Sequence, residues 1–134
     1  MSVPRPRSRD VDRPVVTVCR GCCCGTAGKH PDINHDAQLA ELRAGVGDAG
    51  LVRVSDCLDS CEHSNVIVVG PSAAGRRAGA RPTWLLGVLD RKTTADIVAW
   101  VRGGGPGVAE PPPVLDLRVF TPARRASRLL RPGT

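Results

Sequence analysis

Short apolar runs separated by glycine- and proline-rich stretches form the basic pattern of this chain. Four runs have the length of a strand, 15–18, 51–54, 65–70 and 83–89, and the first of them is β-branched throughout. Two further stretches space their apolar residues as a helix does. Asn34 or Asp36 can cap the first of these helices, and the second is expected to start at Thr93. Glycines follow each stretch and end both helices.

Each expected helix has a definite apolar face. The first face consists of Ala37, Leu39, Ala40 and Leu42, and the second of Ile97, Val98, Trp100 and Val101. The elements follow one another as β-α-β-β-β-α, which predicts an α/β fold. Two strands joined through a helix form a parallel pair by a crossover. We therefore expect one four-stranded mixed sheet with two main helices, a thioredoxin-like arrangement.

The two ends of the chain lack this periodicity. Residues 1–14 are rich in Pro, Arg and Asp, and residues 104–134 combine a polyproline stretch with basic residues. We expect both to be disordered extensions of a single domain at 15–103. An alternating run at 114–120 leaves open that the tail is an ordered docking peptide. Within the domain, 71–82 has the composition of a mobile linker.

The formal net charge of +6 lies mostly in these ends. Residues 15–103 hold ten basic against nine acidic side chains, so the domain lacks the basic face that nucleic-acid binding requires. No apolar run reaches the length of a membrane span, and no apolar stretch of signal-peptide length follows the N-terminus. We expect a cytoplasmic protein that binds neither nucleic acid nor membrane.

Six cysteines follow the first two predicted strands in two short groups. The first group is Cys19, Cys22, Cys23 and Cys24, and the second is Cys57 and Cys61. In a reducing compartment, clustered cysteines indicate metal binding or catalysis rather than structural disulfides. Because open α/β sheets bind ligands at the carboxyl ends of their strands, we expect both groups to meet there.

The spacing of these thiols suits an iron–sulfur cluster. Taking Cys19 with Cys24 gives C-x4-C, and Cys57 with Cys61 gives C-x3-C. In a [2Fe–2S] cluster each iron takes two terminal thiolates, so two short-range pairs can hold it. Cys22 and Cys23 are alternates for the second ligand.

The second group also carries a resemblance to a known family. The sequence Cys57-Leu58-Asp59-Ser60-Cys61-Glu62-His63-Ser64-Asn65-Val66 resembles the C-L-G-x-C-x-x-G-P-N-V signature of thioredoxin-like [2Fe–2S] ferredoxins and of the related small iron–sulfur subunit of NADH dehydrogenase. The resemblance covers about residues 15–103. It implies an electron carrier rather than an enzyme, a redox partner protein of unknown identity and often a homodimer. Asp59 and Ser64 depart from the signature, and the family has one cysteine where this chain has three adjacent ones.

Two other functions use the same thiols. Four thiolates also satisfy tetrahedral zinc in a structural or adaptor protein, although the spacing is unusual for zinc. The sequence Cys19-Arg20-Gly21-Cys22 is a C-x2-C after a strand, as in thiol–disulfide oxidoreductases. That interpretation leaves Cys57 and Cys61 without a role.

Histidine and tryptophan are further candidates for the site. His30, His35 and His63 could ligate metal, but we expect them to make polar contacts in loops or to stand at the start of a helix. Trp84 and Trp100 fit the core better than a cofactor site.

Overall fold

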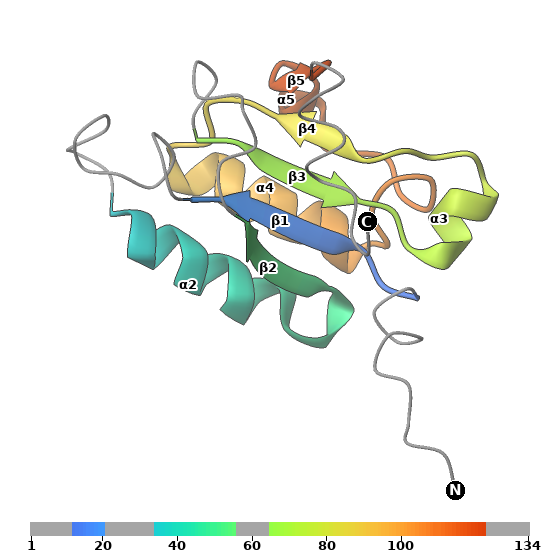
Figure 1. The fold of residues 1–134 in the computed structure, drawn as a ribbon, viewed down its shortest axis with the longest axis horizontal. Coiled ribbons are helices and arrows are strands. Elements are labelled where there is room, and N and C mark those ends of the chain that lie inside the picture. Colours follow the sequence, from blue (N-terminus) through green and yellow to red (C-terminus); the bar gives the residue numbers. More distant parts are fainter. Residues whose placement is uncertain (1–11, 21–33, 56–64, 123–134) are drawn as a thin grey trace, which may run out of the picture.

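The computed structural model describes residues 12–20, 34–55 and 65–122. Within these residues the chain forms one five-stranded mixed sheet and four α-helices (Figure 1). The strands are β1 (Val15–Cys19), β2 (Leu51–Ser55), β3 (Ile67–Gly70), β4 (Thr83–Leu85) and β5 (Val119–Phe120). The helices are α2 (His35–Val46), α3 (Ala73–Arg77), α4 (Arg91–Arg102) and α5 (Pro113–Asp116), with a 3₁₀ turn η1 (Gly47–Ala49) after α2.

The strands lie in the order β2-β1-β3-β4-β5. β1 and β2 are parallel and are joined through α2, as the crossover rule predicts. β3 is antiparallel to β1, and β4 is antiparallel to β3. The α/β class and each of the four predicted strands are therefore confirmed. The predicted total of four strands is wrong, because the sheet has five. β5 pairs antiparallel with β4 and adds the fifth.

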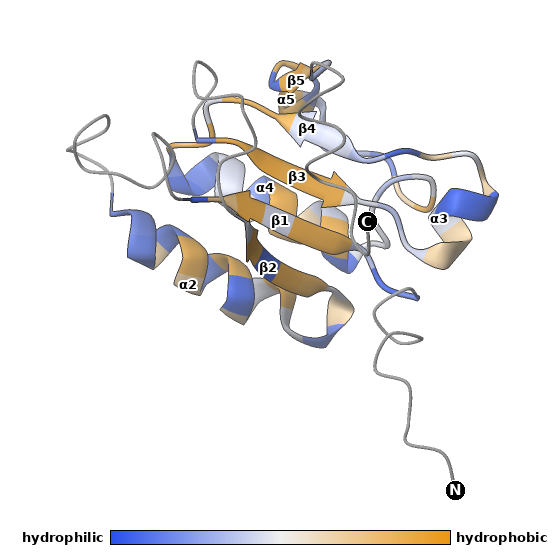
Figure 2. Ribbon diagram, in the orientation of Figure 1, coloured by the Kyte–Doolittle hydropathy of each residue, from blue (hydrophilic) through white to orange (hydrophobic). Residues whose placement is uncertain are grey.

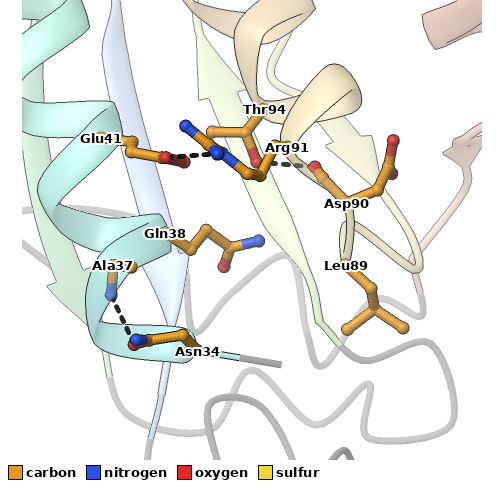
Figure 3. Close-up of a pocket in the computed structure, with 8 residues that line it drawn as sticks. All are labelled: Asn34, Ala37, Gln38, Glu41, Leu89, Asp90, Arg91 and Thr94. Carbon is orange, nitrogen blue, oxygen red and sulfur yellow. Dashed lines mark hydrogen bonds and ion pairs between the residues drawn. The ribbon is translucent and has the colours of Figure 1, made fainter. Parts of the chain in front are cut away.

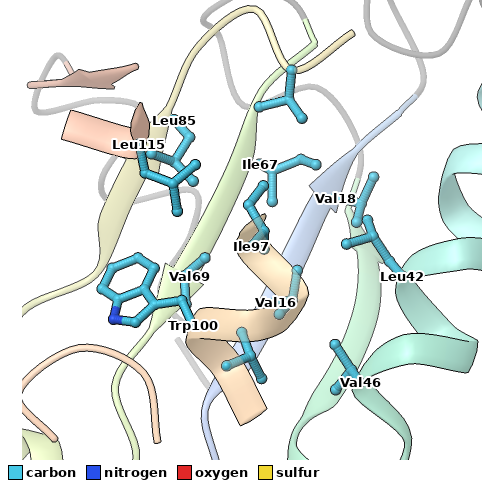
Figure 4. Packing of buried hydrophobic residues seen from close by; sticks show 12 residues of the cluster. Val16, Val18, Leu42, Val46, Ile67, Val69, Leu85, Ile97, Trp100 and Leu115 are labelled. Carbon is cyan, nitrogen blue, oxygen red and sulfur yellow. The ribbon is translucent and has the colours of Figure 1, made fainter. Parts of the chain in front are cut away.

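Both long helices pack on one face of the sheet (Figure 4). Alternate residues of the central strands point to this face, and they form one buried cluster with apolar residues of α2 and α4. Its buried members are Val16, Val18, Leu42, Val46, Ile67, Val69, Leu85, Val88, Ile97, Trp100, Val101 and Leu115. Figure 2 shows the same organisation, since β1 and β3 are strongly apolar whereas α2 mixes apolar and polar positions.

The opposite face of the sheet has its own apolar cluster. The side chains of Cys19, Val66, Val68 and Trp84 are buried there, with Phe120 packed against them. The Trp84 and Phe120 rings meet edge to face, 5.9 Å apart. Cys19 therefore points away from α2 and α4. Trp84 and Trp100 are both core residues, as predicted.

Helix α2 differs from its prediction in the face that it buries. Asn34 caps it by accepting a hydrogen bond from the Ala37 backbone N–H (2.9 Å), which settles the choice of cap. The buried positions are His35, Gln38, Leu42 and Val46. Ala37 and Ala40, which were expected on the buried face, are exposed. Two of the four buried positions are thus polar, and their hydrogen bonds explain why they can be buried.

Helix α4 starts two residues earlier than predicted. Asp90 is its cap, because its carboxylate accepts a hydrogen bond from the Thr93 backbone N–H (3.1 Å). The predicted apolar face of this helix is confirmed at Ile97, Trp100 and Val101, which are buried.

The predicted linker at 71–82 is wrong, because it contains α3. Ser72 caps this helix by accepting from the Gly75 backbone N–H (3.1 Å), and Gly75 is buried against the Pro106 backbone. Arg76 and Arg77 of α3 are exposed. Figure 2 shows that part of this helix is strongly hydrophilic.

The prediction of a disordered tail is wrong for residues 104–122. Leu115 of α5 is fully buried in the main core, and β5 pairs with β4. The Trp100 indole N–H donates to the Ala109 carbonyl at 2.9 Å, which ties this segment to α4. The folded unit therefore continues past residue 103. The disorder predicted for 1–14 is wrong at Pro14, which is buried and accepts a hydrogen bond from the Leu51 backbone N–H at 2.9 Å. Residues 1–11 and 123–134 lie outside the described residues.

None of the helices in the described part of the chain is both long and apolar enough to cross a membrane.

Candidate functional site

The two cysteine groups follow neighbouring parallel strands. Cys19 and Ser55 are register partners at the carboxyl ends of β1 and β2. The Arg20 backbone N–H continues the ladder by donating to the Ser55 carbonyl at 3.0 Å. Segments 21–33 and 56–64, which contain the other five cysteines, therefore begin from adjacent strand ends.

The far ends of both segments return to the same edge of the sheet. Segment 56–64 leads into Asn65 and Val66, and the Cys19 backbone N–H donates to the Val66 carbonyl at 3.1 Å. Segment 21–33 leads into Asn34 at the start of α2, which begins at this edge (left of Figure 1). All four points where the described chain enters or leaves the cysteine segments thus lie at one edge.

Chain length limits how far the remaining thiols can be from this edge. Cys57 is two residues from Ser55, so their Cα atoms are at most about 7 Å apart. Cys61 is four residues from Asn65, a reach of at most about 14 Å.

Of the predicted ligands, the structure describes Cys19. It lies at the end of β1 with 2% of its surface exposed. Cys22, Cys23, Cys24, Cys57 and Cys61 lie outside the described residues, as do His30 and His63. Within the described ranges, no group of three or more His, Cys, Asp or Glu could hold a metal ion. The ligand set and the choice of second ligand stay predictions.

His35 is a helix-entry residue, as expected. It is the first residue of α2, and 7% of its surface is exposed. Its Nδ1 lies 2.9 Å from Nδ2 of the fully buried Asn65. Because an amide nitrogen only donates, Nδ1 is the acceptor of this hydrogen bond. This bond connects the residue two positions after segment 21–33 to the residue that follows segment 56–64.

Gln38, one turn further along α2, makes a second connection. Its Nε2 donates to the Val88 carbonyl at 2.7 Å, and its Oε1 accepts from Arg20 Nη2 at 2.9 Å. The Val88 backbone N–H donates to the Asn65 carbonyl at 3.0 Å. Arg20 Nη2 also donates to the His35 carbonyl at 3.2 Å, which closes the circuit. We call this circuit the polar ring: Arg20, His35, Gln38, Asn65 and Val88.

Sequence reasoning missed Arg20, Gln38 and Val88 as parts of the site. Arg20 stands among the cysteines, and Gln38 interrupts an otherwise apolar helical stripe, so each had a weak signal. Their partners lie 15 to 50 residues away, and no local pattern shows such pairings.

A cavity of about 390 Å³ opens beside the polar ring, between the first turns of α2 and α4 (Figure 3). Its lining residues are Asn34, Ala37, Gln38, Glu41, Leu89, Asp90, Arg91 and Thr94. An ion pair of 3.0 Å between Arg91 Nε and Glu41 Oε2 bridges the two helices across it. Six of the eight lining residues are polar, and several of their polar groups are already engaged in helix caps and in the ion pair.

Asp90, on the wall of this cavity, has a carboxyl group with a displaced pKa. Its hydrogen bonding with Thr93 holds the pKa of the carboxyl below its ordinary value, and burial opposes the effect. Arg118, with Nη2 at 3.9 Å from Oδ1, lowers the pKa of Asp90 slightly further.

Fold and site together define an α/β protein in which two cysteine segments start and end at one edge of a mixed sheet. No protein family, curated protein or solved structure matches this chain. The resemblance of residues 57–66 to the ferredoxin signature stays a prediction.

Proposed function

We propose that this chain is an electron carrier that holds one [2Fe–2S] cluster on Cys19, Cys24, Cys57 and Cys61. The observation that carries the proposal is the pairing of Cys19 with Ser55 at the ends of two parallel strands. This pairing places Cys19 and the start of segment 21–33 next to the start of segment 56–64, which suits a cluster held by Cys19 and Cys24 from one side and by Cys57 and Cys61 from the other.

The strand order supports a thioredoxin-like core. β1 and β2 are a parallel pair with α2 as the crossover, β3 and β4 are antiparallel neighbours, and α4 follows β4, so these elements keep the β-α-β-β-β-α order that suggests such a core. On this interpretation α3, α5 and β5 are additions to that core.

The surroundings of Cys19 fit a cluster ligand. Its side chain lies among Val66, Val68 and Trp84, which keep water from that side of the sulfur. Solvent exposure and hydrogen bonds to sulfur set the potential of such clusters. When bound, the cluster supplies one-electron transfer, and the residues of this chain hold it and shield it from water.

The same burial disfavours a thiol–disulfide oxidoreductase that attacks through Cys19. An attacking thiolate must be accessible to its substrate, whereas 2% of Cys19 is exposed.

Iron and sulfide analysis of the anaerobically purified chain tests the proposal. We expect about two iron and two sulfide per chain, with visible charge-transfer bands. Replacement of Cys57 or Cys61 by Ser should abolish the bands, whereas the neighbouring Ser55→Ala should keep them. Stoichiometric zinc without iron would show a zinc protein instead. A colourless, metal-free chain with a reversible disulfide would favour the oxidoreductase.

A further inference from the structure

The polar ring contacts the chain at three of the four ends of the cysteine segments. Arg20 precedes segment 21–33, His35 closely follows it, and Asn65 follows segment 56–64. The fourth end, Ser55, is bonded to the backbone of Arg20. We propose that Arg20 and Gln38 are positioning residues that hold the flanking ends of the two cysteine segments in a fixed relation before any metal binds. The inference rests on the proposed function, because it assigns the thiols so held to cluster binding.

Arg20 joins the last residue of β1 to the first turn of α2. Its Nη1 donates to the Cys19 carbonyl at 2.9 Å, and its Nη2 donates to the His35 carbonyl and to Gln38 Oε1. A guanidinium presents its donors in a rigid plane, so bonds to both sides fix the strand end relative to the helix. This contact sets where segment 21–33 starts relative to where it ends.

Gln38 carries the connection from this segment to the other one. Its amide bonds Arg20 on one side and the Val88 carbonyl on the other. Val88 in turn bonds the backbone of Asn65, where segment 56–64 ends. The side chain of Asn65 closes the circuit at His35.

Burial makes this circuit specific. Gln38 is 5% exposed and Asn65 is fully buried, so each amide atom that loses its partner is left without water. Because both of its amide atoms have hydrogen-bond partners, the buried side chain of Gln38 is held in one orientation.

Cobalt binding to the reduced, metal-free, full-length chain tests the inference. Co²⁺ reports the number of thiolate ligands through its visible and charge-transfer absorption, and it needs no cluster assembly. Loss of groups that orient metal ligands typically weakens metal affinity 10- to 100-fold. We expect that loss for Arg20→Gln and for Gln38→Met, with fewer thiolates per Co²⁺ than the four of the unsubstituted chain.

The matched control is Arg43→Gln, which removes an exposed guanidinium from the last turn of the same helix. It should change the Co²⁺ affinity less than threefold. Arg20→Lys, which keeps the charge and part of the donor set, should give an intermediate loss. Far-UV circular dichroism checks that each variant is folded. If Arg20→Gln or Gln38→Met does not fold, Arg20→Lys and Gln38→Glu take their place, and an unchanged affinity in folded variants overturns the inference.

The outcomes separate this inference from the proposed function. A chain that contains iron and sulfide, with variants that bind Co²⁺ as tightly as the parent, keeps the function and overturns the positioning role. Tight four-thiolate Co²⁺ binding that depends on Arg20 and Gln38, without iron in the purified chain, keeps the positioning role and overturns the cluster. A parent chain that shows no four-thiolate Co²⁺ spectrum overturns the positioning role.

Discussion

Gln38 and His35 occupy the buried side of α2, where most amphipathic helices place apolar residues. Both are tolerated there because their polar atoms have partners: Gln38 bonds Arg20 and Val88, and His35 bonds Asn65. Two turns further along, Leu42 and Val46 occupy the same side and contact the main core. The same face of α2 thus makes polar contacts near the ends of the cysteine segments in its first turn and apolar contacts with the core in its last turns.

The ionisation of Asp90 should affect the free energy of unfolding of the chain. The folded-state pKa of its carboxyl is lowered, chiefly by hydrogen bonding with Thr93. The ionised form is therefore favoured in the folded chain, and this contribution is complete above the unfolded pKa of about 4. It is lost as the pH falls through the lower folded pKa. Asp90→Asn keeps a cap but not the charge, so its deficit in unfolding free energy should be constant above about pH 5 and shrink below pH 4.

Urea unfolding at several pH values measures this difference. Asp90→Ala also removes the cap acceptor, so it should cost about 1 kcal/mol more than Asp90→Asn. A deficit for Asp90→Asn that grows as the pH falls would contradict the lowered pKa.

At the scale of elements, α3 depends on a close backbone approach. A Cβ atom on Gly75 would overlap the Pro106 carbonyl oxygen and lie 3.0 Å from the Pro71 Cβ. Neither neighbour is a flexible side chain that can move aside. The helix therefore docks on the turn after α4 because position 75 has no side chain.

Gly75→Ala should destabilise the chain. Alanine favours a helix by about 1 kcal/mol, but overpacking against fixed backbone costs about 1–3 kcal/mol. The matched control is Gly70→Ala, since a Cβ there would meet its nearest atom at an ordinary 3.5 Å. Thermal unfolding should show a lower midpoint for Gly75→Ala and a nearly unchanged one for Gly70→Ala. Equal midpoints for the two variants would contradict this expectation, because they would show that the turn at Pro106 moves aside to accommodate the alanine Cβ.

At the scale of the whole molecule, the segment from 104 to 122 completes the core. Leu115 fills the main cluster beside Leu85 and Trp100 (Figure 4), and β5 covers the edge of β4. Within the run at 114–120, Leu115 is the residue buried in the main core, whereas Leu117 is 82% exposed and Val119 is 47% exposed.

A chain truncated after Gly105 should therefore be far less stable than one truncated after Pro122. Leu115→Ala alone should cost about 2–5 kcal/mol, and the truncation also removes β5 and the Trp100–Ala109 hydrogen bond. Each kcal/mol lowers the midpoint of a domain of this size by roughly 4 °C or more. Thermal unfolding of the two chains gives the comparison. The segment would be a mere extension if both unfolded at the same temperature.

Local sequence pattern was enough for much of this architecture. β-branched runs marked β1 to β4, and helical spacing marked α2 and α4, because these signals arise from the geometry of each element alone. The crossover rule then made β1 and β2 parallel and placed Cys19 beside the end of β2. The start of both cysteine segments at this edge thus followed from the order of the elements and the crossover rule.

Tertiary structure decided the rest. The alternation at 114–120 is too short to distinguish a strand from a tail. In the fold this stretch contributes α5 and β5, and Leu115 of α5 packs with Leu85 and Trp100 in the main core. The ring partners are up to 50 residues apart, so only the packed fold brings Gln38 to Val88 and His35 to Asn65. A sequence shows which residues have polar groups, whereas burial decides which of those groups must find a partner.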